Sequence, residues 1–194
     1  MRLYRLPFST NVERVTLALA HKGIAVTSVE IDPGDRSEVE RVSGQPLVPV
    51  LQDDGRVVAD STAILEYLEE RYPQPPLYPR EPARRAEVTI FVDWFNRVWK
   101  RWPNSIEASA GDDESRAAMA ASLELFEALL DGRDYLFGEF SAADCAAFPF
   151  LKYGAGRDPA DDELFHRILA DNLPLSGHPR VEAWIHRVDA HPRA

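Results

Sequence analysis

The sequence has little of what a secreted, membrane-spanning or disulfide-bonded protein needs. Its single cysteine, Cys145, cannot form a disulfide within the chain, which suits a reducing compartment. No run of apolar residues approaches the roughly 20 that a membrane-spanning helix requires. The first residues, Met1 to Leu6, lack the apolar core and small-residue cleavage site of a signal peptide. We therefore expect a cytoplasmic protein with no membrane partner.

Basic residues are in the minority. The 22 Lys and Arg stand against 32 Asp and Glu, which gives a formal net charge of −10. A broad nucleic-acid surface needs clustered basic residues, so this balance predicts no nucleic-acid partner. The histidines have no spacing typical of a metal site, and we expect no metal. The 45% hydrophobic and 28% charged content is that of an ordinary globular protein.

Strand and helix patterns alternate over about the first 80 residues. Short apolar runs bounded by turn residues predict strands at 3–6, 24–31, 48–51 and 56–59. Helical spacing predicts helices at 11–22, in a short polar stretch that ends at Arg41, and at 60–72. The order is βαβ, a helix, then ββα. It predicts a parallel pair followed by an antiparallel hairpin, in a mixed four-stranded sheet.

A proline cluster marks the domain boundary. Its members are Pro73, Pro75, Pro76, Pro79 and Pro82. Prolines at this density continue neither a helix nor a central strand. We expect a first domain at 1–75, a linker at 76–82 and an all-helical domain at 83–194. Helices in the second domain are predicted at 81–109, with an interruption at Pro103, and at 114–130, 141–153, 162–170 and 179–190.

The first candidate site lies where the first strand passes into the first helix, from Pro7 to Asn11. Unpaired amide groups at a helix N-terminus favour an anion such as a thiolate. The Ser9 hydroxyl can donate a hydrogen bond to sulfur. Ser, Thr and Asn are also the favoured N-cap residues, so plain helix capping is the commoner use of such a motif.

Two further motifs precede residue 62. A cis Val48–Pro49 bond would present the Val48 main chain as an edge for an extended peptide; an ordinary edge-strand proline is the alternative. Ser61, as the cap of the next helix, would offer its amide and hydroxyl to a ligand carboxylate, and Asp60 could pair with an ammonium group. Capping alone is the alternative here too.

The positions of these three motifs in the predicted elements are more informative than any one of them. They stand at the end of the first strand, the start of the third and the turn after the fourth. A compact βαβ-αββα unit would bring all three to one edge of its sheet. One site would then hold a sulfur position, a peptide-like edge and a place for an amino-acid head, which are the needs of a small cysteine-containing peptide.

Nearly the whole chain resembles the cytosolic glutathione transferases. The shared motifs in the first domain are Leu3 to Ser9, Arg14-Val15, Leu17 to Ile24, Val48 to Leu51 and, most specifically, Asp60 to Pro73. Those in the helical domain are the capping box Ser141-Ala142-Ala143-Asp144, Pro149, and the segment from His178 through Trp184 to Pro192. Ser9-Thr10-Asn11 resembles both the serine-type classes and the bacterial classes with Asn two residues after Ser or Thr.

The resemblance implies a thioredoxin-like first domain that binds glutathione as co-substrate and an all-α second domain that contributes the substrate pocket and a homodimer interface. The implied reaction is conjugation of glutathione to small hydrophobic electrophiles, a detoxification chemistry. Glutathione-dependent disulfide reductase or peroxidase activity, and a non-catalytic binding protein of the same fold, remain the alternatives.

The resemblance also implies roles for individual residues. Ser9 would stabilise the thiolate, with Asn11 or Tyr4 as alternatives, and Val48 with cis-Pro49 would hold the cysteinyl backbone. Asp60 and Ser61 would bind the γ-glutamyl head. Candidates for the glycine end are Arg36, Arg41 and Gln45.

The aromatic residues predict where an apolar substrate would lie. The candidates for this hydrophobic pocket are Phe8, Phe95, Trp99 and Trp102. Aromatic stripes at helical spacing more often pack in a core than touch a substrate. Cys145 follows the capping box into a predicted buried helix, and we interpret it as a core residue rather than a nucleophile.

Overall fold

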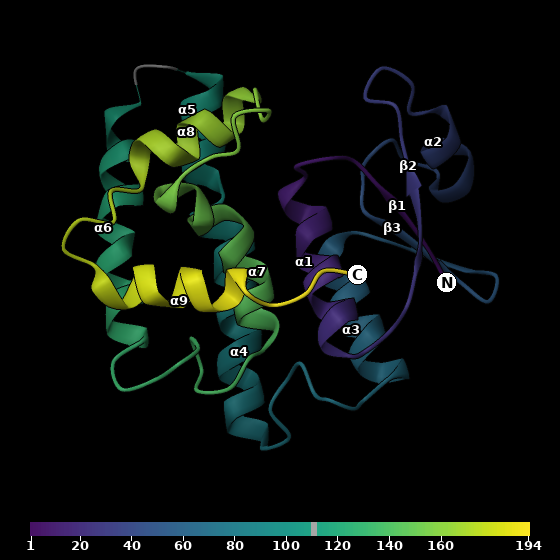
Figure 1. The fold of residues 1–194 in the computed structure, drawn as a ribbon, viewed down its shortest axis with the longest axis horizontal. Helices are drawn as coiled ribbons and strands as arrows, with labels where there is room; N and C mark the ends of the chain where they lie inside the picture. The colour runs from purple at the N-terminus through teal and green to yellow at the C-terminus, as the bar shows by residue number, and fades with distance from the viewer. Residues whose placement is uncertain (110–111) are drawn as a thin grey trace. The chain divides into compact units, whose positions relative to one another are not determined.

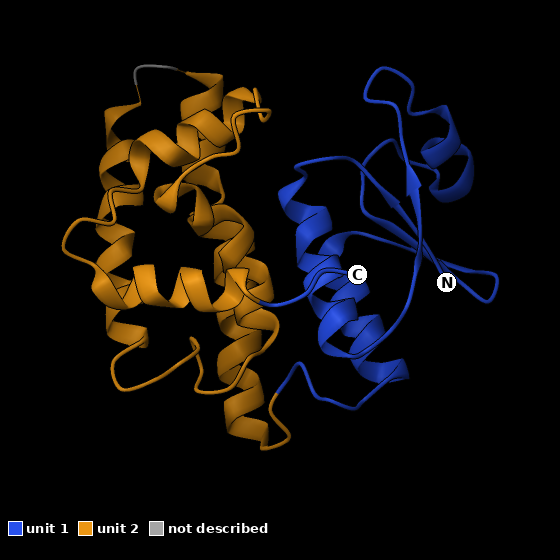
Figure 2. Ribbon diagram, viewed as in Figure 1, with its two compact units in different colours: residues 1–78, 191–194 blue, residues 79–190 orange. Residues whose placement is uncertain are grey.

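The computed structural model describes residues 1–109 and 112–194, and the chain divides into two compact units (Figure 2). Unit 1 comprises residues 1–78 together with 191–194, and unit 2 comprises residues 79–190. None of the helices in these described ranges is long and apolar enough to cross a membrane.

Unit 1 is built on a four-stranded mixed sheet with the strand order β2-β1-β3-β4. Its elements are β1 (Arg2–Arg5), α1 (Thr10–His21), β2 (Thr27–Glu30), α2 (Ser37–Ser43), β3 (Val50–Asp53), β4 (Arg56–Ala59) and α3 (Ser61–Arg71). β1 pairs in parallel with β2 and antiparallel with β3, which forms a hairpin with β4. This arrangement confirms the thioredoxin-like fold predicted from the sequence.

The two faces of this sheet are covered by different helices. Tyr4 and Val50 pack with Val39 of α2. Because side chains alternate along a strand, the fully buried Leu3 and Leu51 point to the opposite face. There α1 and α3 pack against each other (Figure 1).

Two strands begin later than predicted, whereas β1 is shifted by a single residue. β2 begins at Thr27 rather than at residue 24, because the Ile24 amide donates to the Leu19 carbonyl and closes the end of α1. β3 begins at Val50 rather than at residue 48. Pro49 has no N–H for the ladder, so pairing starts after it.

All the helices and strands assigned to unit 2 over its described residues are helices. Its elements are α4 (Pro82–Trp94), a π-helical segment η1 (Phe95–Trp99), α5 (Arg101–Ala108), α6 (Asp113–Leu129), α7 (Ala142–Leu151), a 3₁₀ turn η2 (Lys152–Ala155), α8 (Leu164–Asn172) and α9 (Pro179–Asp189). Every residue of α7 is buried, so this helix forms the centre of the unit. The all-α second domain is thereby confirmed.

The interruption of the first long helix of unit 2 begins earlier than predicted. The sequence places it at Pro103, whereas the π-helical turn starts at Phe95, and the Lys100 amide donates to the Phe95 carbonyl at 3.0 Å. Proline lacks an N–H and its ring clashes with the carbonyl four residues before it, here that of Trp99. A wider turn upstream accommodates this clash, as π-bulges commonly do.

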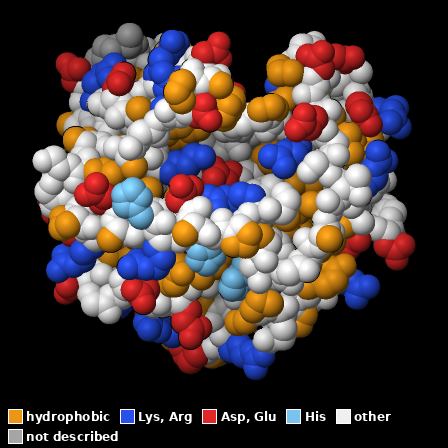
Figure 3. Space-filling view, viewed as in Figure 1, with side chains coloured by type: hydrophobic (Ala, Val, Ile, Leu, Met, Phe, Trp, Pro, Cys, Tyr) orange, Lys and Arg blue, Asp and Glu red, His pale blue; other side chains and the backbone are white. Residues whose placement is uncertain are grey.

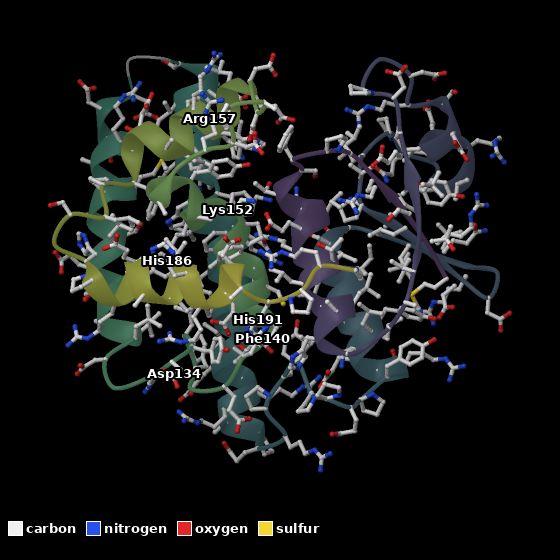
Figure 4. All side chains as sticks on the ribbon, in the orientation of Figure 1. Asp134, Phe140, Lys152, Arg157, His186 and His191 are labelled. Atoms are coloured by element: carbon white, nitrogen blue, oxygen red, sulfur yellow. The ribbon has the colours of Figure 1, made fainter. Side chains whose placement is uncertain are left out.

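Ion pairs and mixed charge mark the surface of unit 2. Arg187 of α9 pairs with Asp134 at 3.3 Å, and Figure 4 labels Asp134 in the loop near that helix. Arg180 pairs with Asp131 at 2.7 Å. On the face drawn in Figure 3, acidic and basic side chains are interspersed rather than gathered by sign, a distribution that favours solubility.

Candidate glutathione site

The strand register brings the sequence motifs of unit 1 to one end of the sheet. Tyr4 of β1 lies opposite Val50 of β3, which in turn lies opposite Ala59 of β4. The segments that leave β1, enter β3 and leave β4 therefore lie at the same end. These segments hold the three motifs predicted from the sequence: Ser9, Pro49 and Asp60.

Ser9 is the N-cap of α1. Its Oγ accepts a hydrogen bond from the Val12 amide at 3.4 Å, which uses an oxygen lone pair and leaves the hydroxyl hydrogen able to donate elsewhere. Capping and donation to a ligand are thus compatible. Phe8 has φ 58°, a left-handed conformation uncommon for a bulky residue. Such conformations gather at functional sites.

The two alternatives to Ser9 lie in different surroundings. Asn11 is the second residue of α1 and is partly exposed. Tyr4 is only 1% exposed, and its hydroxyl donates to Gln52 Oε1 at 3.3 Å inside the sheet. Tyr4 is therefore a core residue, whereas Ser9 and Asn11 both lie at the start of α1.

The Val48–Pro49 peptide bond is cis. Gln45 holds the residue before it in place, since its Oε1 accepts from the Leu47 amide at 2.7 Å and its Nε2 donates to the Leu47 carbonyl at 2.8 Å. No hydrogen bond within the described parts of the chain involves the Val48 main chain. Its amide and carbonyl can pair with an extended peptide.

The three candidates for the glycine end differ in how they are held. Gln45 uses its side-chain amide within its own loop. Arg36 donates from Nε to the Pro33 carbonyl at 3.2 Å, and Arg41 is exposed on α2. The residue that meets the glycine end stays a prediction among these three.

The prediction that Ser61 caps α3 is wrong, because Asp60 is the cap. Its Oδ1 accepts from the Thr62 amide at 2.9 Å and from the Ala63 amide at 3.1 Å. Either residue type can cap a helix, and Asp60 stands one position earlier, from which it reaches the second and third helical amides. Its φ of 76° is a second left-handed conformation at this end of the sheet. Ser61, the first helical residue, is 4% exposed.

Arg14 lies directly behind Ser61. It is 2% exposed, and its Nη1 donates to Ser61 Oγ at 3.4 Å across 47 residues of sequence. Sequence reasoning recorded Arg14 only as part of a shared motif. The signal that could have identified it is an arginine on the apolar stripe of α1, between Val12 and Val15, where a charged side chain needs a buried partner.

The last residues of the chain lie along α1. Arg193 donates from Nη2 to Glu13 Oε1 at 3.1 Å, and the Ala194 amide donates to the Thr16 carbonyl at 3.2 Å. Burial lowers the pKa of His191, which Figure 4 labels where this segment begins. The contact pairs the carboxylate in the first turn of α1 with a cation, and this reduces its repulsion of an anion at the helix start.

The aromatic candidates for the substrate pocket are mostly core residues. Phe95 and Trp99 are fully buried and stack with ring centroids 4.6 Å apart, and Trp99 Nε1 donates to Ser122 Oγ at 2.9 Å. Trp102 is partly exposed, and its ring lies edge-on to Trp99 at 6.4 Å. Phe8 in unit 1 is 39% exposed. Of the four, only Phe8 and Trp102 have exposed surface, and their role stays a prediction.

No group of three or more His, Cys, Asp or Glu in residues 1–109 and 112–194 could hold a metal ion. Cys145 is buried in α7. The candidate site of unit 1 therefore consists of hydroxyls, main-chain groups, one buried arginine and one exposed carboxylate.

Comparison with known proteins places this geometry in a family. Residues 3–76 match the glutathione S-transferase N-terminal domain, and residues 91–187 match the glutathione S-transferase C-terminal domain. Maleylacetoacetate isomerase of Pseudomonas aeruginosa is 43% identical over 93 residues, a match that covers 44% of this chain and 44% of that protein. A stringent starvation protein A homolog of Pasteurella multocida is 31% identical over 144 residues, covering 71% and 67% of the two chains.

A solved structure agrees with both matches. A glutathione S-transferase from Rhodospirillum rubrum F11 superimposes with a TM-score of 0.75 at 30% identity, over 98% of this chain and 88% of that one. Both domains are matched in their order along the chain, and the fold is shared over almost the whole length. This chain belongs to the glutathione S-transferase family.

Proposed function

We propose that the protein is a glutathione transferase that joins the glutathione thiolate to small hydrophobic electrophiles. The observation that carries this proposal is the convergence at one end of the unit 1 sheet of a helix start, a main-chain edge and a carboxylate beside a buried hydroxyl. These features belong to Ser9, to Val48 beside Pro49, and to the Asp60–Ser61 pair. They match the sulfur, the peptide backbone and the amino-acid head of one tripeptide.

The chemistry of the first step is stabilisation of a thiolate. A free thiol has a pKa near 8.5, so only a small fraction is ionised at neutral pH. Donation from the Ser9 hydroxyl and the partial positive charge at the start of α1 both favour the charged form and lower that pKa. The thiolate sulfur then bonds to an electrophilic carbon. A leaving group departs with its electron pair, or an activated double bond takes up a proton.

The remaining residues orient the tripeptide rather than react. The Val48 amide and carbonyl would pair with the cysteinyl main chain, in the manner of an added strand. Asp60 would meet the ammonium group of the γ-glutamyl head, and Ser61 its carboxylate. Holding both ends fixes the sulfur near Ser9, and such positioning is itself a major source of rate enhancement.

Replacement of Ser9 by alanine is expected to lower kcat/KM for thiol conjugation by about 10-fold to 100-fold, the worth of one hydrogen bond to a charged group. The pKa of bound glutathione should rise at the same time. Steady-state assays and thiolate absorbance against pH measure the two effects. The exposed Ser28→Ala on β2 is the matched control and should leave both unchanged.

Other results would redirect or overturn this assignment. Unchanged activity in Ser9→Ala would move the chemistry to Asn11, because Tyr4 is buried in the core. A wild-type protein that neither binds immobilised glutathione nor conjugates any electrophile would exclude the transferase. Retention on glutathione without turnover would support a non-catalytic binding protein instead.

A second reaction of the same thiolate is favoured by the 43% identity to a maleylacetoacetate isomerase over 93 residues. A thiolate can add to a conjugated double bond, allow rotation about the resulting single bond, and leave again with its electron pair. Glutathione is then regenerated. With a cis-configured conjugated keto acid as substrate, isomerisation without loss of glutathione would support this reaction, and stoichiometric consumption would support conjugation.

The proposal also covers the co-substrate, the oligomeric state and the cellular location of the protein. Members of the family use glutathione as substrate, and we propose that this chain does so as a homodimer in the cytoplasm. Disulfide reductase or peroxidase activity remains an alternative, tested with a mixed disulfide or a hydroperoxide in the same assay.

A further inference from the structure

Arg14 is a buried cation directly behind the proposed γ-glutamyl site. It lies on the second turn of α1, whereas Ser61 begins α3, and the contact between them joins two helices far apart in sequence. Arg14 is 2% exposed and Ser61 is 4% exposed, so water competes little for this hydrogen bond.

The contact with Arg14 fixes the direction in which the Ser61 hydroxyl can donate a hydrogen bond. A guanidinium only donates hydrogen bonds, so Ser61 Oγ receives the one from Arg14 Nη1 through an oxygen lone pair. The hydroxyl hydrogen then points away from Arg14 and is available to donate. A hydroxyl held in this way suits an acceptor-only group such as a carboxylate.

The charges around Ser61 select the same kind of ligand. Arg14 and the partially positive start of α3 both favour an anion beside Ser61. Asp60 is exposed next to it and has its Oδ1 engaged with the α3 amides, which leaves Oδ2 for a cation. An anion and a cation on adjacent positions match the two ends of an α-amino acid.

We propose that Arg14 is a positioning residue for the α-carboxylate of the γ-glutamyl head, and that it acts through the Ser61 hydroxyl. The inference deepens the proposed function and rests on it. It names the ligand group that Arg14 helps to hold. It also predicts that the protein binds thiol peptides with a free α-carboxylate more tightly than those without one, and that this preference depends on Arg14.

The test compares two ligands rather than one. Calorimetric titration would measure Kd for glutathione and for γ-aminobutyryl-cysteinyl-glycine, which is the same tripeptide without its α-carboxylate. The wild type should prefer glutathione by at least about 10-fold, the worth of a hydrogen bond to a charged group. In Arg14→Met the Kd for glutathione should rise by about the same factor, while the Kd for the analogue stays nearly unchanged.

Three further variants and one control separate this role from structural support. Ser61→Ala should lose the preference as Arg14→Met does, and the double variant should lose no more, because both act on one hydrogen bond. Arg14→Lys keeps a donor and should retain an intermediate preference, which provides a test even if the methionine variant folds poorly. Arg71→Met, at the other end of α3, is the matched control and should keep the full preference.

The outcomes distinguish the two proposals. If the wild type prefers glutathione and Arg14→Lys and Arg14→Met keep that preference unchanged, the inference fails and the proposed function stands. Equal weakening of both ligands in Arg14→Met would show that Arg14 only supports the fold, which also overturns the inference. If the wild type binds neither tripeptide, the proposed function fails first and the inference falls with it.

Discussion

Replacement of Lys22 by methionine is expected to lower the unfolding free energy of unit 1 by about 3–5 kcal/mol, the usual effect of breaking a buried ion pair. The Lys22 side chain is 0% exposed, and its Nζ donates to Glu69 Oε2 at 2.9 Å and to the Tyr72 and Pro75 carbonyls at 2.7 and 2.9 Å. Methionine fills the space but donates no hydrogen bond. A buried carboxylate and two carbonyls would lose their cation.

This contact joins the ends of α1 and α3, the two helices at whose starts Ser9 and Ser61 lie. Denaturant unfolding followed separately in each unit would measure the loss. Lys22→Met combined with Glu69→Gln should cost less than the sum of the single changes. Arg84→Met, which breaks the exposed pair with Glu87, is the control at about 0–1 kcal/mol. A Lys22→Met loss no larger than this control would contradict the prediction.

The second large loss of stability is expected when Asp144, the fully buried carboxylate of the α7 capping box, is replaced. Its Oδ1 accepts from the Leu136 amide at 3.1 Å and from Trp184 Nε1 at 2.8 Å, and its Oδ2 accepts from the Ser141 amide at 2.9 Å. Asp144→Ala leaves these donors buried without an acceptor, at about 1–3 kcal/mol each. Removal of a buried negative charge offsets part of this cost. We therefore expect the unfolding free energy of unit 2 to fall by about 3–4 kcal/mol at pH 7.

Asp144→Asn is the matched control, since the amide keeps one acceptor oxygen and the same shape. It should cost about half as much as the alanine variant. Thermal or denaturant unfolding of unit 2 gives both values. Similar losses in the two variants would mean that packing, rather than the hydrogen bonds, makes this position sensitive.

The same carboxyl predicts a pH dependence of stability. Burial raises the pKa of Asp144 from 3.8 to about 6, so the folded protein binds this proton more tightly than the unfolded chain. The associated stability is fully present below pH 3.8 and is lost as the pH rises to about 6, by about 3 kcal/mol in total. The difference in unfolding free energy between wild type and Asp144→Asn should fall across this range. A difference that rises instead would show that the surrounding donors outweigh burial.

The sequence predicted the elements of unit 1 because their signals are local. Gly23 ends the first helix with φ +65°, and Asp54 with Gly55 forms the hairpin, as their residue types indicate. Errors occurred where a tertiary contact or a neighbouring residue competed with a local rule. Ser61 has good cap chemistry, but Asp60 stands one residue earlier and takes the role.

The places of the candidate site residues in the fold could also be predicted from the sequence, whereas their roles stay predictions. Ser9, Pro49 and Asp60 were chosen as candidates because each stands at an element boundary, where capping and turn chemistry leave a recognisable residue type. Their meeting at one end of the sheet followed from topology rules that need only the order of the elements. The sequence did not single out Arg14, because nothing near it along the chain reveals its contact with Ser61.

The amino-acid sequence by itself determined the order of helices and strands, the division into a mixed-sheet unit and a helical unit, and the residue types at the helix starts. Periodicity, capping and proline placement act within a few residues, so they can be read along the chain. Only the tertiary structure decided that Arg14 meets Ser61 and that Lys22 meets Glu69, both across 47 residues. Such pairs form because packing removes water from charged groups, and which groups lose their water depends on the whole fold.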